Sequence, residues 1–240
     1  MRTRPVVYCD FDGTITQSDV VDLLLVELAD PQWQEIEAQW HQGLIGSRDC
    51  LARQIPLIRG GWAAVARTLE QVRLEPTFPA FAAWCRARGV TLQIVSDGMD
   101  RVIHTLLARE GVMVDSVRAN HLVESPSGEL SLAFPVPSKD RSCGAGLCKC
   151  QALKDAHQSV FRVVIGDGRS DWCWARQADL VFAKSELLSY CNQQEIPCRP
   201  FAGFDTIQRA LEPLVKLPAR RAMGPRTATP ASRYALERAS

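Results

Sequence analysis

Short apolar runs separated by helical patterns dominate the hydrophobic profile of the chain. Four of these runs are rich in Val and Ile or end abruptly at polar residues, and they cover residues 5–9, 90–95, 161–165 and 180–182. Runs of this length and composition are typical of strands that are buried on both faces, as in a parallel sheet covered by helices. The pattern therefore predicts an α/β fold.

Helical spacing of apolar residues fills the stretches around these runs. The predicted helices cover residues 77–88, 98–110, 147–158 and 170–177. Gly89 and Gly111 directly follow the first two helices, as expected for C-terminal caps, and Ser170 and Asp171 suit the start of the last. Alternating apolar residues on both sides of 125–128 predict a β-hairpin over 116–134, and 135–146 is predicted to be a loop.

The stretch from residue 18 to residue 74 differs, because it contains no clear strand pattern. Four helices are predicted there, over 19–28, 30–40, 47–58 and 61–72. Since they lie between the first and second strands, we interpret 18–74 as an inserted helical cap and 1–17 with 75–216 as the catalytic core. Residues 217–240 are predicted to be a mobile basic tail.

Composition and charge narrow the possible partners. The chain has 240 residues and a formal net charge of +1, so electrostatics give no reason to expect nucleic acid. No apolar run is long enough to span a membrane, and the N-terminus does not have the pattern of a signal peptide. We therefore expect a cytoplasmic protein without a membrane or nucleic-acid partner, and the sequence leaves its oligomeric state open.

The nine cysteines are interpreted as reduced thiols of a cytosolic chain. Three of them cluster at Cys143, Cys148 and Cys150. A zinc site would need a fourth ligand, and no histidine is placed at suitable spacing, so we do not expect a metal there.

Oxygen-bearing side chains follow three of the predicted strands. Asp10, Ser96 and Asp167 come directly after the strands, and Asp12 and Asp171 follow within about one turn. The carboxyl ends of parallel strands meet at one edge of a sheet, where ligands bind. Clustered carboxylates raise each other's pKa, and a hard cation such as Mg²⁺ relieves that repulsion. The pattern predicts a magnesium site open to a phosphate.

The local motifs sharpen this prediction. Residues 10–16, Asp-Phe-Asp-Gly-Thr-Ile-Thr, resemble the first motif of the haloacid dehalogenase superfamily and follow a buried strand. Ser96, Lys149 and the 166–171 run Gly-Asp-Gly-Arg-Ser-Asp match the remaining motifs in order. The resemblance spans about residues 5–205. It implies a Rossmann-like three-layer core with a parallel sheet and a cap of the first type, and the activity of a Mg²⁺-dependent phosphatase acting on a small phosphorylated metabolite.

The same resemblance assigns roles to individual residues. It implies that Asp10 attacks phosphorus and that Asp12 protonates the leaving group and later deprotonates the attacking water. The implied metal ligands are Asp10, Asp12 through its main-chain carbonyl, and Asp167. Asp171 is implied either to bind the metal directly or to contact one of its ligands. Lys149 would also hold Asp10 as a carboxylate. The implied phosphate-binding set is Gly13, Thr14, Ser96, Asp97, Gly98 and Lys149.

Less common pieces of sequence favour one branch of the family, whose members act on an enol phosphate of methionine salvage. These pieces are 9–16, 31–36, 96–100, 143–149 and 185–191. Two positions depart from that branch: Asp97 stands where glycine is common, and Gly168 where serine is common. An acid beside the phosphate would repel it, so we expect Asp97 to point away or to serve another substrate.

Three alternatives remain open from the sequence. A phosphoserine phosphatase would use an acid and an arginine of the cap, and Asp19 could be the acid, whereas the arginine position falls near Gln54, beside Arg53. Asp19, Arg48 and Arg53 are therefore the candidates for substrate specificity. Phosphoryl transfer to an acceptor other than water shares the first half-reaction. A non-catalytic binding module is disfavoured, because the chain keeps every motif residue.

Overall fold

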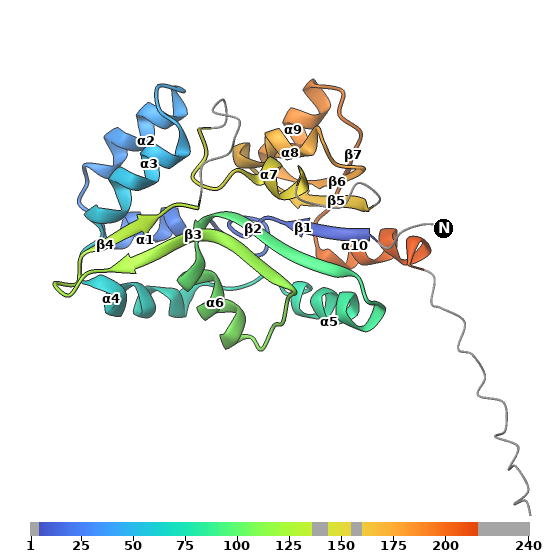
Figure 1. Cartoon of the computed structure of the whole chain (residues 1–240), viewed down its shortest axis with the longest axis horizontal. Coiled ribbons are helices and arrows are strands. Elements are labelled where there is room, and N and C mark those ends of the chain that lie inside the picture. The colour runs from blue at the N-terminus through green and yellow to red at the C-terminus, as the bar shows by residue number, and fades with distance from the viewer. Residues whose placement is uncertain (1–4, 136–143, 155–159, 216–240) are drawn as a thin grey trace, which may run out of the picture.

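A seven-stranded sheet forms the centre of the computed structural model, which describes residues 5–135, 144–154 and 160–215 (Figure 1). The strand order is β4-β3-β2-β1-β5-β6-β7, and every neighbouring pair is parallel except β3 with β4. The predicted α/β class is confirmed. The strands are β1 (Pro5–Cys9), β2 (Thr91–Met99), β3 (Ser116–Glu124), β4 (Leu130–Ala133), β5 (Phe161–Gly166), β6 (Leu180–Ala183) and β7 (Cys198–Pro200).

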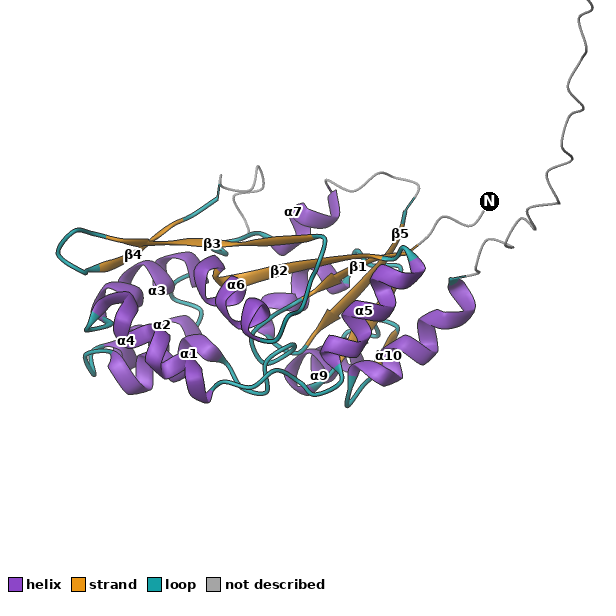
Figure 2. Ribbon diagram, turned by 90° about the horizontal axis from the view of Figure 1, so that it is seen from below, coloured by secondary structure: helices purple, strands orange, loops and turns teal. Residues whose placement is uncertain are grey.

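Helices cover both faces of this sheet (Figures 1 and 2). One face carries α5 (Phe78–Arg88), α6 (Asp100–Arg109) and α10 (Phe204–Leu211), and the other carries α7 (Lys149–Lys154), α8 (Trp172–Ala175) and α9 (Ser185–Gln193).

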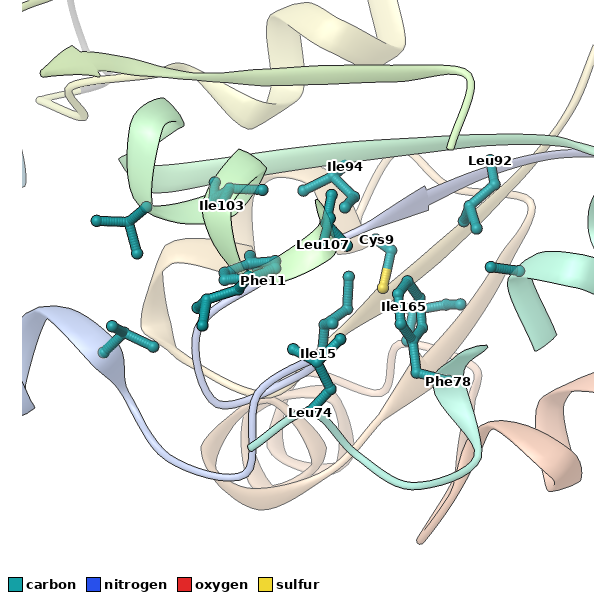
Figure 3. Packing of buried hydrophobic residues seen from close by; sticks show 14 of the residues in the cluster. Cys9, Phe11, Ile15, Leu74, Phe78, Leu92, Ile94, Ile103, Leu107 and Ile165 are labelled. Carbon is teal, nitrogen blue, oxygen red and sulfur yellow. The ribbon is translucent and has the colours of Figure 1, made fainter. Parts of the chain in front are cut away.

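Side chains of the central strand β1 alternate between these two layers. Val7 and Cys9 join the cluster that includes Phe78, as Figure 3 shows for Cys9, whereas Tyr8 packs with Trp174 on the opposite face. Successive side chains of a strand point to opposite faces, so a strand apolar throughout must be covered on both. The apolar run at 5–9 therefore fits a strand buried on both faces.

Four helices lie between β1 and α5, and we call them the cap helices: α1 (Val20–Leu28), α2 (Trp33–His41), α3 (Ser47–Gln54) and α4 (Gly61–Thr68). The buried apolar residues Leu24 and Leu25 of α1 and Val65 of α4 belong to the same continuous cluster as residues of the sheet, whereas Ile36 of α2 and Cys50 of α3 do not. Helices α1 and α4 are thus anchored on the core by shared apolar packing. The division at residues 18 and 74 stays a prediction.

Three features of the fold differ from the sequence pattern. Strand β2 continues to Met99 across an irregularity, because Met99 pairs with Asn120 of β3, so Ser96 lies within the strand and α6 begins at Asp100. The helix expected over 170–177 is a 3₁₀ turn (Arg169–Asp171) followed by α8. The helix expected over 147–158 begins two residues later, at Lys149 of α7, and the expected residues 155–158, like the tail at 217–240, lie outside the described residues.

Elements β7, α9 and α10 were not predicted. For α10 a signal was present, since Phe204, Ile207 and Leu211 have helical spacing and are fully buried. Across the described ranges, no helix is both long enough and apolar enough to cross a membrane.

Candidate active site

The ends of three neighbouring strands bring the predicted site residues together. Strand β1 lies between β2 and β5, so Asp10 after β1, Ser96 in β2 and Asp167 after β5 lie at the same edge of the sheet. All three line a cavity of about 320 Å³, which the cap helices close on its other side. This is the crevice that parallel strands form at their carboxyl ends.

A buried lysine lies behind the carboxylates. Lys149, the first residue of α7, is 2% exposed, and its Nζ lies 2.7 Å from Asp10 Oδ1 and 2.8 Å from Asp171 Oδ1. It also donates a hydrogen bond to Ser170 Oγ. Carboxylate oxygens of Asp10, Asp167 and Asp171 all lie within 4.8 Å of one another.

Asp171 shapes the loop that follows β5. Its Oδ2 accepts hydrogen bonds from the main-chain N–H groups of Asp167 (3.0 Å) and Gly168 (3.1 Å), and its Oδ1 accepts from Lys149. Asp171 is fully buried and does not line the cavity. Its carboxylate thus holds Asp167 and Lys149 in place from behind.

Burial dominates the electrostatics of this cluster. It raises the pKa of Asp10 well above its usual value, the charge of Asp171 raises it further, and Lys149 opposes both. The pKa of Asp167 is raised as well, first by burial. Burial alone would lower the pKa of Lys149, but Asp10 and Asp171 outweigh it and raise that pKa above its usual value. The ammonium therefore stays charged among the acids.

Asp12 faces the cavity from the loop after β1. Its Oδ1 accepts the N–H of Val20 at the start of α1 (3.2 Å), and its Oδ2 lies 3.3 Å from Ser96 Oγ. Burial, followed by the charge of Asp19, raises the pKa of Asp12 to about 7. A carboxyl group with this pKa can donate and accept a proton near neutral pH.

The predicted phosphate-binding residues divide into two groups. Ser96, Asp97 and Gly98 line the cavity, and Ser96 Oγ accepts the N–H of Gly98. Gly13 and Thr14 shape the loop after β1: their N–H groups donate to Thr16 Oγ1 and the Phe11 carbonyl, and Thr14 Oγ1 donates to Asp167 Oδ1. A role of these two residues in phosphate binding stays a prediction.

The loop after β1 requires glycine at residue 13. Gly13 has a φ of +67°, in the left-handed region, and a Cβ there would collide with the Asp167 carboxylate. Glycine at residue 13 therefore lets the loop after β1 pack closely against Asp167.

The Asp97 carboxylate, which lines the cavity, accepts hydrogen bonds from two other segments of the chain. Its Oδ2 accepts a hydrogen bond from Ser47 Oγ of α3, and its Oδ1 accepts the N–H of Leu147. The neighbouring Asn120 donates to the Asp97 carbonyl.

The cap region supplies Asp19, which was a specificity candidate from the sequence, and most of the lining residues that the sequence did not indicate. Asp19 caps α1 and lines the cavity, and its pKa is raised to about 6, first by burial and then by Asp22. Gln54 is 1% exposed and donates to Glu37 Oε2 at 2.7 Å. Further cap residues that line the cavity are Val21, Asp22, Trp40, His41, Ser47, Cys50 and Leu51, and the core adds Gly168, Arg169, Ser170 and Glu186.

The two arginine candidates lie apart from this cavity. The guanidinium of Arg48 stacks over the Phe134 ring at 4.5 Å, and Arg53 donates to Gln39 Oε1 at 2.8 Å. Neither arginine is among the residues that line the cavity.

In the cysteine cluster, the Sγ atoms of Cys148 and Cys150 are 3.1 Å apart, and Cys143 lies outside the described residues.

A buried acidic cluster with one lysine, at the carboxyl edge of a parallel sheet and below a helical cap, defines an α/β phosphoryl-handling enzyme. The family comparison agrees, since residues 7–176 match the haloacid dehalogenase-like hydrolases. The chain belongs to this family. Two curated relatives that match over 97% and 98% of their own length are named phosphatases. The protein is therefore a phosphatase.

Two relatives show the extent of the sequence similarity. The 2-hydroxy-3-keto-5-methylthiopentenyl-1-phosphate phosphatase of Geobacillus kaustophilus is 31% identical over 218 residues, which cover 88% of this chain and 97% of the relative. The bifunctional enzyme MtnB/MtnX of Bacillus licheniformis is 29% identical over 87% of this chain, which corresponds to 49% of that protein.

Solved structures show the same fold at lower identity. A substrate-bound phosphoserine phosphatase has a TM-score of 0.65 at 16% identity, covering 90% of this chain and 100% of that chain. A probable phosphoserine phosphatase from Vibrio cholerae has a TM-score of 0.64 at 21% identity, covering 90% of this chain and 68% of that chain.

Proposed function

We propose that the protein hydrolyses a small phosphomonoester in two steps through an aspartyl-phosphate on Asp10. The observation that supports this most is the contact of Asp10 Oδ1 with the buried ammonium of Lys149 at 2.7 Å. Phe11 N–H also donates to Oδ1, so the other oxygen, Oδ2, is the one available to attack phosphorus.

The residues around Asp10 fit a magnesium ion. Three carboxylates within 4.8 Å, opposed by one lysine, form a hard-oxygen donor set with negative charge in excess. Asp10 and Asp167 would hold Mg²⁺ with the main-chain carbonyl of Asp12, and Asp171 would support them from behind. The bound ion would supply positive charge that stabilises the phosphoryl group.

Asp12 has the placement and the pKa for the proton transfers. In the first step the bond between phosphorus and the leaving oxygen breaks, and the Asp12 carboxyl gives its proton to that oxygen. In the second step the Asp12 carboxylate takes a proton from the water that attacks the aspartyl-phosphate, which releases phosphate and restores Asp10. Such general acid–base catalysis typically contributes about 10²- to 10⁴-fold.

For the substrate, we propose the enol phosphate named in the relatives, 2-hydroxy-3-keto-5-methylthiopentenyl-1-phosphate. It carries no carboxylate, and its methylthio end is apolar. Val21, Leu51 and Trp40 on the cap side of the cavity could contact such an end.

The cap helices also disfavour the alternative, phosphoserine. Among the described residues that line the cavity, they contribute the acids Asp19, Asp22 and Glu37 and no lysine or arginine. Gln54, near the position where the phosphoserine enzymes use arginine, is neutral, and its amide is bound to Glu37. A substrate carboxylate would be repelled here, which selects against phosphoserine.

The test is phosphate release from a panel of metabolite phosphates, with Mg²⁺ and with EDTA. We expect EDTA-sensitive turnover that Asp10→Asn abolishes, whereas the matched control Asp205→Asn, an exposed carboxylate of α10, keeps the wild-type rate. Turnover by Asp10→Asn at a rate near that of the wild type would contradict the mechanism. Product analysis with added alcohols separates hydrolysis from phosphoryl transfer to another acceptor.

The panel should include phosphoserine and phosphoethanolamine, which differ only by a carboxylate. We expect kcat/KM for phosphoserine to be lower by about tenfold or more, equivalent to about 1.4 kcal/mol. A preference for phosphoserine would keep the chemistry and refute the substrate assignment.

A further inference from the structure

Asp97 connects a cap helix to the segment that precedes Lys149. Its Oδ2 accepts a hydrogen bond from Ser47 Oγ at 2.5 Å, and Ser47 is the first residue of α3. Its Oδ1 accepts the main-chain N–H of Leu147 at 2.7 Å, two residues before Lys149, and an N–H of Asn120 at 3.2 Å. The two oxygens of one carboxylate therefore hold two segments that are about a hundred residues apart in the sequence.

The main chain before Lys149 is packed between α3 and β2. Arg48 N–H donates to the Gly144 carbonyl at 3.0 Å, and a Cβ on Gly144 would lie 3.1 Å from Gly46 Cα. On the other side, a Cβ on Gly146 would lie 2.6 Å from Asp97 Oδ1 and 2.9 Å from Asn120 Nδ2. Gly144 lets this segment approach the backbone at Gly46, and Gly146 lets it approach the side chains of Asp97 and Asn120, so we expect a shift of α3 to displace the segment that ends at Lys149.

We propose that Asp97 is a positioning residue that couples the seating of α3 to the placement of the Lys149 ammonium beside Asp10. The inference rests on the role of Lys149 in the proposed function. It also explains how an acid is tolerated next to Ser96, since both oxygens of Asp97 accept hydrogen bonds from protein donors.

The first test measures backbone hydrogen exchange of the metal-free, substrate-free enzyme. We expect Asp97→Ala and Ser47→Ala both to speed exchange in residues 144–154 and in α3. The control is Arg101→Gln, which weakens a different contact between core and cap, where the Arg101 guanidinium stacks over the Trp62 ring at 3.9 Å. Arg101→Gln should speed exchange around Trp62 and leave 144–154 unchanged.

The second test measures turnover of p-nitrophenyl phosphate with Mg²⁺. Loss of an acceptor shared by three donors should lower kcat by about tenfold or more in Asp97→Ala. Asp97→Asn should lose less, because its oxygen can still accept from Leu147 while its amide donates to the Ser47 hydroxyl. Ser47→Ala should have little further effect in the Asp97→Ala background, since the contact is already lost.

Three results would overturn the proposal. Exchange in 144–154 that is unchanged in Asp97→Ala would show that Asp97 does not hold this segment. An Asp97→Asn variant as impaired as Asp97→Ala would show that the charge itself is used. A lower KM with an unchanged kcat in both Asp97 variants would show that Asp97 merely repels the substrate. The exchange test uses no substrate, so it distinguishes failure of this proposal from failure of the proposed function.

Discussion

Replacing Lys149 by methionine removes the cation that contacts Asp10 and Asp171. Methionine keeps the length and much of the volume of the lysine stem, so packing against Trp174, whose ring lies 5.2 Å from Lys149 Nζ, changes little. The electrostatic change is large by comparison, because two ion pairs of 2.7 and 2.8 Å are lost in a site where Lys149 is 2% exposed.

The expected loss of stability follows from burial. Removing one partner of a buried ion pair typically costs about 3–5 kcal/mol, because the remaining charge is left uncompensated. Here Asp10 and Asp171 can relieve part of that cost by binding a proton, so we expect about 3 kcal/mol for Lys149→Met at neutral pH in EDTA.

The assay is urea unfolding followed by tryptophan fluorescence, with Lys154→Met as the control. Lys154 lies on the same helix α7 and is exposed, so its replacement should change the unfolding free energy by less than about 0.5 kcal/mol.

The pH and the metal provide two further readouts. Burial already raises the pKa of Asp10 above 3.8, and loss of Lys149 raises it further. The folded variant then binds more protons than the unfolded chain, so its stability falls as pH rises above about 4, and the deficit relative to wild type grows with pH. Mg²⁺ should stabilise Lys149→Met more than wild type, because it replaces the lost positive charge. A variant as stable as the wild type at pH 7 in EDTA would refute this reasoning.

Three more predictions concern the site and the core. Since Asp12 must be protonated for the first step, kcat/KM should fall as pH rises through about 7, and Asp19→Asn should move that fall to lower pH in a pH–rate profile. Gly13→Ala should lower phosphatase activity by more than tenfold and stability by about 1 kcal/mol or more in urea, since its Cβ would displace Asp167. Phe204→Ala should cost about 3–5 kcal/mol in the same assay, because the ring is fully buried against other aromatic rings.

The position of the site could be predicted because it depends on local sequence and one topological rule. The runs at 5–9 and 161–165 show where two strands end, and parallel strands end at the same edge of the sheet. That is enough to place Asp10 and Asp167 at the same edge, and the pairing of β1 with β5 in the structure makes them neighbours. The exact end of β2 could not be predicted, because the pairing of Met99 with Asn120 of β3 extends the strand past Val95.

The cap side of the cavity could not be predicted for a different reason. Gln54 and Glu37 lie on separate helices, and their contact depends on how α2 and α3 pack. Helical spacing indicates which face of a helix is apolar but not which polar residues face a shared cavity. Arg48 and Arg53 are an example. Both are on α3 and were predicted as candidates for substrate specificity, yet both contact residues that do not line the cavity.

The charge balance of the acidic cluster supports a divalent cation more strongly than the sequence alone does. From the sequence, several carboxylates near one point predict a hard cation such as Mg²⁺. In the structure Lys149 contacts Asp10 and Asp171, so three carboxylates and one ammonium leave an excess of two negative charges. The pKa of Asp10 and that of Asp167 are raised, first by burial and then by the charge of Asp171, despite the opposing lysine. A doubly charged cation balances the excess negative charge, and only then can a phosphate dianion approach Asp10 without strong repulsion.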